Sequence, residues 1–189
     1  MRRTVGSLLW AVGFPAAMIL GAGIGQWVTW IGVVLMLAAV AVAACLIGGV
    51  WHRAGAATLA SVAGFLLMLF AGPAVYETYM ATAGEPAAAV VTRVTGREDR
   101  SAEMSCSVRE TGGDRATYEV SQQENCFGQA DVGDRVEIRK DPLGLLDPRL
   151  PDGPDQEGTT RITVAAAAGL ALLTGAATFY AGQRRRRGA

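Results

Sequence analysis

Four stretches of the chain are apolar and free of formal charge over lengths that suit membrane-spanning helices. The first uncharged run extends from Thr4 to Trp51. At roughly 1.5 Å per residue, one helix over these 48 residues would reach about 72 Å, more than twice the ~30 Å hydrocarbon thickness of a bilayer. The run therefore predicts two helices, with a break at Gly25-Gln26. With two later runs, the pattern predicts spanning helices near residues 8–24, 29–50, 54–76 and 162–181.

The first of these helices has a second interpretation. Met1-Arg2-Arg3 followed by an apolar stretch is also typical of a signal peptide. Two observations favour a retained helix. The apolar run scarcely pauses before the second helix, and no small-x-small site is followed by the polar start of a mature chain.

Between the third and fourth helices the hydrophobic pattern changes to a period of two, which is typical of strands with one apolar face. Two such apolar sets lie on either side of the turn signal Thr111–Asp114: Met104, Cys106 and Val108, then Ala116, Tyr118 and Val120. Since opposed residues face the same side, Val108 pairs with either Ala116 or Tyr118. Both pairings require a loop of odd length, and three residues with a glycine in the αL conformation fit best.

Two further segments predict strands around this hairpin. Ala88–Thr95 is rich in valine and threonine, and Arg135–Lys140 alternates with Val136 and Ile138 inward. Asp141-Pro142 ends the latter strand, because proline cannot donate to the ladder. We therefore expect a membrane α-helical protein whose residues 77–142 form a small extracytoplasmic all-β domain, either a sheet or a partly closed barrel. Residues 143–160 are rich in proline and acids and predict an extended linker to the fourth helix.

The charges are distributed unevenly along the chain. All 17 acidic residues lie between Glu77 and Glu157, and nine basic residues share that stretch, which gives it a net charge of −8. The remaining cations are Arg2, Arg3, Arg53, Arg161 and Arg184–Arg187. Four helices place both termini on one side, and all of these cations except Arg161 then share it. The distribution predicts that this side is the cytoplasm and that residues 77–160 lie outside the cell membrane.

The cysteines agree with that orientation. Cys106 and Cys126 lie in the polar segment, and two cysteines in a small exported domain predict a disulfide. Its loop closure contributes roughly 3 kcal/mol to the stability of the domain. Cys45 lies within the second helix, where a small packing residue is expected. The terminal cluster Arg184, Arg185, Arg186 and Arg187 is expected to bind anionic lipid headgroups and to fix orientation.

The end of the polar segment resembles a known group of proteins. Val132-Gly133-Asp134-Arg135-Val136-Glu137-Ile138, followed by Asp141-Pro142, is similar to the ending of a small β-domain in bacterial, actinobacterial-type multi-pass membrane proteins of unknown function. In that group the domain closes with a G-D-x-V-x-[VI] strand and Asp-Pro beside or between membrane helices. The resemblance implies a membrane-attached β-domain and no catalytic residues, cofactor or metal. The use of one lysine against sixteen arginines also indicates a bacterial source.

Candidate chemistry is sparse. The only histidine, His52, is predicted at the cytoplasmic end of the second helix, so the outer domain lacks the base that a Ser-His-Asp or Cys-His site needs. The spans carry no acid, base or histidine of the kind that ion-coupled transporters use. A joint role of Glu98 and Asp99 in acid–base catalysis is disfavoured, because the side chains of adjacent strand residues point to opposite faces. No nucleic-acid binding is expected.

These observations predict a non-enzymatic envelope protein without catalytic, cofactor or metal sites. Its helices would anchor it in the lipid bilayer, and its disulfide-bonded β-domain would bind an envelope partner or act as a scaffold. The alternative is a small transporter subunit or channel-like homo-oligomer. Pairs of small residues four apart favour close helix packing in either case, namely Gly21 with Gly25, Ala165 with Gly169, and Ala171 with Gly175.

Overall fold

The chain folds into two compact units, each with its own core. The computed structural model describes residues 2–96, 104–113, 115–153 and 158–184. Met1–Tyr76 and Thr160–Ala189 form one unit, which we call the helix bundle, and Glu77–Thr159 form the second, which we call the sheet domain. The buried clusters of the two units share no residue.

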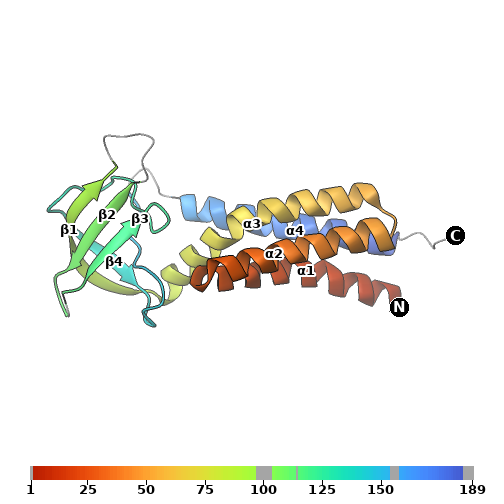
Figure 1. Ribbon diagram of the computed structural model, residues 1–189, viewed down its shortest axis with the longest axis horizontal. Helices are drawn as coiled ribbons and strands as arrows, with labels where there is room; N and C mark the ends of the chain where they lie inside the picture. The colour runs from red at the N-terminus through yellow and green to blue at the C-terminus, as the bar shows by residue number, and fades with distance from the viewer. Residues whose placement is uncertain (1, 97–103, 114, 154–157, 185–189) are drawn as a thin grey trace. The chain divides into compact units, whose positions relative to one another are not determined.

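The helix bundle contains the four helices that the sequence predicts, each long and apolar enough to cross a membrane. They lie side by side in Figure 1, and two shared clusters of buried residues draw on all four. Their bounds are α1 (Arg2–Trp27), α2 (Thr29–Ala44), continued by the π-helical segment η1 (Cys45–Val50), α3 (Ala54–Ala83) and α4 (Thr159–Gln183). The last turns of α3 belong to the sheet domain.

The break between α1 and α2 lies at Val28, not at the predicted Gly25-Gln26. Val28 has φ −136° and ψ 87°, and helix stands on both sides of it. Gly25 stays helical, and its backbone lies so close to Gly32 of α2 that a Cβ on Gly32 would lie 2.7 Å from the Gly25 nitrogen. Pro15 lies inside α1 and Pro73 inside α3, and neither proline ends its helix.

The bundle has small residues inside and large apolar residues outside. Leu9, Trp30 and Leu172 are 68%, 69% and 75% exposed. The buried positions are mostly alanine, threonine and methionine: Ala11, Met18, Ala22, Met36, Ala43, Ala57, Ala60, Ala63, Ala71, Thr174, Ala177, Thr178 and Ala181. Lipid tails are as apolar as leucine, so helices in a bilayer associate by close packing of small residues. The arrangement is the one a lipid environment favours.

The sheet domain holds four strands in an open antiparallel sheet, so the partly closed barrel is not formed. The strands are β1 (Glu85–Thr95), β2 (Ser105–Glu110), β3 (Thr117–Ser121) and β4 (Arg135–Lys140), in the order β3-β2-β1-β4. The edge strands are therefore β3 and β4. The long β1 enters directly from α3, and its first residues pair with the last residues of β4.

The predicted hairpin between β2 and β3 is present. Val108 pairs with Tyr118, one of the two partners that the sequence allowed. Gly113 has φ 59°, the αL conformation expected for a glycine in this loop. The last paired residues are Arg109 and Thr117, so the loop is longer than the predicted three residues. Asp114 lies outside the described residues. Four of the eight predicted inward residues are fully buried, at 1% exposure or less: Cys106, Val108, Val120 and Ile138. The other four, Met104, Ala116, Tyr118 and Val136, are half-buried.

The segment after β4 differs from the predicted extended linker. Leu150 is 1% exposed and belongs to the core of the sheet domain. Arg139 of β4 and Arg149 exchange two backbone hydrogen bonds of 2.9 Å, which add a short bridge beside the sheet. The linker prediction is therefore wrong for residues 143–153, and residues 154–157 lie outside the described part. The physical reason is that a core this small gains from one more buried leucine.

Candidate functional site

The sheet domain is cross-linked through the disulfide that the sequence predicts. Cys106 on β2 and Cys126 in the loop after β3 are joined, with an S–S distance of 2.00 Å and a Cα–Cα distance of 5.9 Å. Both residues lie in the core beside Val108 and Val120. The bridge therefore fixes the β3–β4 loop onto the buried face of the sheet. Cys45 is free and lies on the exposed surface of the helix bundle.

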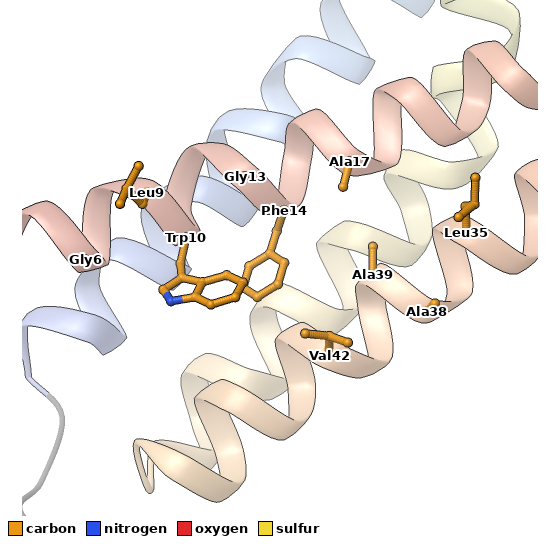
Figure 2. Close-up of a pocket in the computed structure, with 10 residues that line it drawn as sticks. All are labelled: Gly6, Leu9, Trp10, Gly13, Phe14, Ala17, Leu35, Ala38, Ala39 and Val42. Atoms are coloured by element: carbon orange, nitrogen blue, oxygen red, sulfur yellow. The ribbon is translucent and has the colours of Figure 1, made fainter.

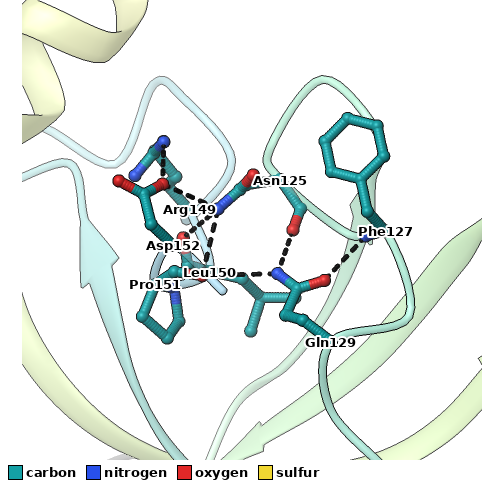
Figure 3. Close-up of polar contacts among 7 residues, drawn as sticks. All are labelled: Asn125, Phe127, Gln129, Arg149, Leu150, Pro151 and Asp152. Carbon is teal, nitrogen blue, oxygen red and sulfur yellow. Dashed lines mark hydrogen bonds and ion pairs between the residues drawn. The ribbon is translucent and has the colours of Figure 1, made fainter. Parts of the chain in front are cut away.

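Asn125, directly before Cys126, is the centre of a polar cluster shown in Figure 3. Its side-chain amide donates to the carbonyls of Leu150 and Pro151 at 3.1 and 3.0 Å and to the Asp152 carboxylate at 3.1 Å. Its φ of 77° is in the left-handed region, which asparagine tolerates better than most residues. This cluster fastens the returning segment to the disulfide loop.

Gln129 completes the same cluster. Its amide nitrogen donates to the Asn125 carbonyl and, at 3.3 Å, to that of Pro151, while its oxygen accepts from the Phe127 nitrogen at 2.8 Å. Arg149 pairs with Asp152 at 2.6 Å. Every one of these groups is used to hold loops together. The Phe127 ring is 50% exposed at the edge of the cluster.

A second polar centre is Asp141, directly after β4. Its carboxylate accepts a hydrogen bond from the Tyr79 hydroxyl at 2.6 Å and from three backbone nitrogens, those of Leu143, Leu145 and Leu146, at 2.8–3.1 Å. Burial raises the pKa of Asp141, but these hydrogen bonds outweigh the burial and hold the pKa below its usual range. The carboxylate therefore fixes the turn 141–146 and ties it to the end of α3.

Lys140 lies beside this turn. It pairs with Glu110 at 2.9 Å and stands 5.7 Å from the centre of the Tyr118 ring. The hydrogen bond to Glu110, followed by that to Tyr118, raises the pKa of Lys140. A cavity of about 150 Å³ lies between Tyr118, Lys140 and the turn. Its charged groups are already paired, and within the described residues no three His, Cys, Asp or Glu side chains group closely enough to hold a metal ion.

The helix bundle carries two apolar grooves along α1. Figure 2 shows the first, of about 560 Å³, between α1 and α2, with Trp10 and Phe14 stacked at 5.0 Å along its wall. Gly6 and Gly13 line it with no atom near the positions that their Cβ atoms would take. The second groove, of about 540 Å³, lies between α1 and α4 and includes Pro15.

One end of the bundle holds two of the arginines that the sequence assigns to the cytoplasmic side, Arg53 and Arg184. The Arg53 guanidinium donates to the Arg184 carbonyl at 2.7 Å, and the Arg184 side chain lies 5.1 Å from the centre of the Tyr180 ring. A Cβ on Gly182 would lie 2.7 Å from the Ser7 side chain of α1. The start of α1, the α2–α3 connection and the end of α4 therefore meet at one end. Arg185, Arg186 and Arg187 lie outside the described residues.

The structure thus brings together some of the predicted residues and adds others. Cys106 and Cys126 are joined, and Arg184 lies beside Arg53, while Glu98-Asp99 falls outside the described residues. Sequence reasoning missed Asn125 and Asp141. The available signals were asparagine directly before a cysteine, and an aspartate before Pro-Leu-Gly, a frequent start of a turn.

Comparisons with protein-family models, with curated proteins and with solved structures gave no match for this chain. Its function is therefore argued from the described geometry alone.

Proposed function

We propose that the chain is a multi-pass membrane protein that anchors a disulfide-bonded sheet domain on the outer side of the cell membrane, where the domain binds an envelope partner without catalysing a reaction. The observation that carries this proposal is the contrast between four apolar helices, each long enough to cross a membrane, and a polar domain that contains the disulfide.

The orientation rests on two independent features. The arginine-rich end of the bundle favours the cytoplasm, because cations are retained there during insertion. A disulfide persists where the surroundings are oxidising, which favours the outside for the sheet domain. The two features agree only if α3 and α4 connect the cytoplasmic side to an outer domain.

A binding role fits the polar groups of the domain. The polar side chains described above form hydrogen bonds within the domain's own loops, namely those of Asn125, Gln129 and Asp141. This arrangement supports a rigid surface. Phe127 and Val132, at 50% and 64% exposure, are apolar residues of the kind that a protein partner can cover.

Reporter fusions at Ala83 and Ala189 test the topology. A reporter that is active only outside the cytoplasm should be active at Ala83 and silent at Ala189. Activity at Ala83 of a reporter that works only in the cytoplasm would contradict the proposal. Purification in mild detergent then tests the role, and an envelope protein retained by the wild type but lost with Phe127→Ser and kept with Thr95→Ala would support it.

The α1–α2 groove favours the second candidate, a homo-oligomer of the channel-like kind. Gly6 and Gly13 are open in that groove, and a helix of a second copy can approach a glycine surface closely. Gly13→Leu would then dissociate the oligomer in detergent, as measured by light scattering. A monomer in the unaltered protein would exclude this candidate.

A further inference from the structure

The turn after β4 displays two leucines that the sheet domain does not use. Leu143 and Leu145 are 68% and 62% exposed. The turn is held in place, because the Asp141 carboxylate accepts hydrogen bonds from the backbone nitrogens of Leu143 and Leu145 at 3.0 and 2.8 Å. A hydrogen-bonded turn holds both leucines on the domain surface, and such exposed apolar groups mark interaction sites.

The same carboxylate also attaches this turn to the end of α3. Tyr79 donates its hydroxyl to Asp141 at 2.6 Å, and Arg139, two residues before Asp141, donates to the Ala81 carbonyl at 3.3 Å. Tyr79 and Ala81 are in the last turns of α3. The leucine turn is therefore bound to the end of this helix by side-chain contacts inside the sheet domain itself.

Helix geometry then gives the distance from the hydrocarbon boundary. The uncharged run of α3, Ala54–Tyr76, is 23 residues and about 35 Å long, slightly more than the ~30 Å hydrocarbon core. Tyr79 follows Tyr76 by three residues, or about 4.5 Å along the same helix. The headgroup region beyond the core is about 5–7 Å thick on each side. Tyr79 consequently lies at the level of the lipid headgroups, and Leu143 is no more than about 7 Å of chain from Asp141.

We infer that Leu143 and Leu145 insert into the headgroup region of the outer leaflet, so that the turn 141–146 is a second membrane contact of the sheet domain. This inference rests on the proposed function, because it requires α3 to span the bilayer. The occupant is a phospholipid interface, whose apolar boundary accepts leucine side chains. Lys140 and Arg139 stand next to the turn, and their charges suit the phosphates of the same headgroups.

Spin labelling of the full chain in phosphatidylcholine–phosphatidylglycerol vesicles tests the inference. In a Cys45→Ala background, labels are attached at Leu143→Cys and Leu145→Cys. The matched control is Val132→Cys, which is 64% exposed in the turn at the opposite end of β4. The five residue steps of β4 separate the two turns by about 17 Å along the strand. A label at Leu69→Cys, on the exposed side of α3, reports membrane insertion by itself.

Collision with oxygen, which dissolves in lipid, and with a water-soluble nickel chelate distinguishes the outcomes. The Leu143 and Leu145 labels should lose nickel accessibility relative to the Val132 label and gain oxygen accessibility. The inference would be overturned if the labels at both leucine positions were as accessible to nickel as the Val132 label while the Leu69 label remained in lipid. The exposed leucines would then be assigned to contact with a protein partner. A Leu69 label accessible to nickel would instead overturn the proposed membrane function.

Discussion

The helix bundle and the sheet domain are stabilised in opposite ways. The bundle buries mainly alanine, and the buried hydroxyls of Thr174 and Thr178 donate to carbonyls of their own helix, at 2.9 and 2.8 Å. The sheet domain buries Val91, Val108 and Ile138, and adds a disulfide and two polar clusters. Helices in lipid gain little free energy from burying apolar side chains, so their association depends on close packing. A domain in water gains much more free energy by burying apolar side chains. A small domain nevertheless has too small a core to be stable by this burial alone.

The first way to test this comparison is to remove the cross-link. Replacing Cys106 and Cys126 by alanine should destabilise the sheet domain by about 3 kcal/mol, because the unfolded chain regains the entropy of the closed loop. Hydrogen exchange followed by mass spectrometry should show faster exchange in β2 and β3 and unchanged exchange in α1–α4. Cys45→Ala is the control and should change neither unit. Equal loosening of the helices would contradict the independence of the two units.

Loss of the Asn125 side chain should have the next largest effect. Asn125→Ala removes three hydrogen-bond contacts and places a Cβ residue without a polar side chain at positive φ, which should cost about 2–3 kcal/mol. Asn125→Gly keeps the backbone conformation and loses only the amide, so it should be less harmful. Denaturant unfolding of the sheet domain would measure both. If the two variants were equally stable, the backbone conformation would contribute nothing.

The helix bundle should respond to added volume. A side chain on Gly32 would meet the Gly21 carbonyl oxygen at 2.6 Å, so Gly32→Val should push α1 and α2 apart and cost about 2 kcal/mol. Gly13→Val is the matched control, because no atom lies near its Cβ position. Thermal unfolding in detergent, followed by helical circular dichroism, compares the two. A lower midpoint for Gly13→Val than for Gly32→Val would show that the α1–α2 contact does not limit stability.

The smallest effect is expected from the Asp141 charge. Its pKa is depressed in the folded protein, so its contribution is fully present above the pKa of the unfolded chain, near 4, and is lost as the pH falls through the lower folded value. Asp141→Asn should cost about 1 kcal/mol at neutral pH, because water can replace part of the lost hydrogen bonding. The free energies of unfolding of wild type and variant should therefore become more similar as the pH is lowered from neutral to acidic values. If the difference between the two free energies did not change with pH, Asp141 would not contribute to the loss of stability in acid.

Sequence patterns predicted the elements better than the contacts between them. The length of the uncharged runs predicted four helices, and the alternation at Cys106 and Val108 predicted a hairpin. The sequence left two registers open, and the structure has the one that pairs Val108 with Tyr118. Composition failed at Leu150, where proline and acid neighbours predicted a linker but one leucine completes a core. Asn125 and Asp141 were missed because their roles depend on distant partners, Leu150 and Tyr79, which no local pattern reveals.

The single non-helical residue between α1 and α2 has a consequence for biosynthesis. Val28 is flanked by Trp27 and Thr29, so the connection contains no charged group that must be carried through the bilayer. In the proposed topology, the first two helices can enter the membrane together as one hairpin as they leave the ribosome. The acidic segment from Glu77 onward has no such route, since each of its charges would be exposed to hydrocarbon. In the proposed topology, transfer of the second outer segment therefore costs more than transfer of the uncharged connection between α1 and α2.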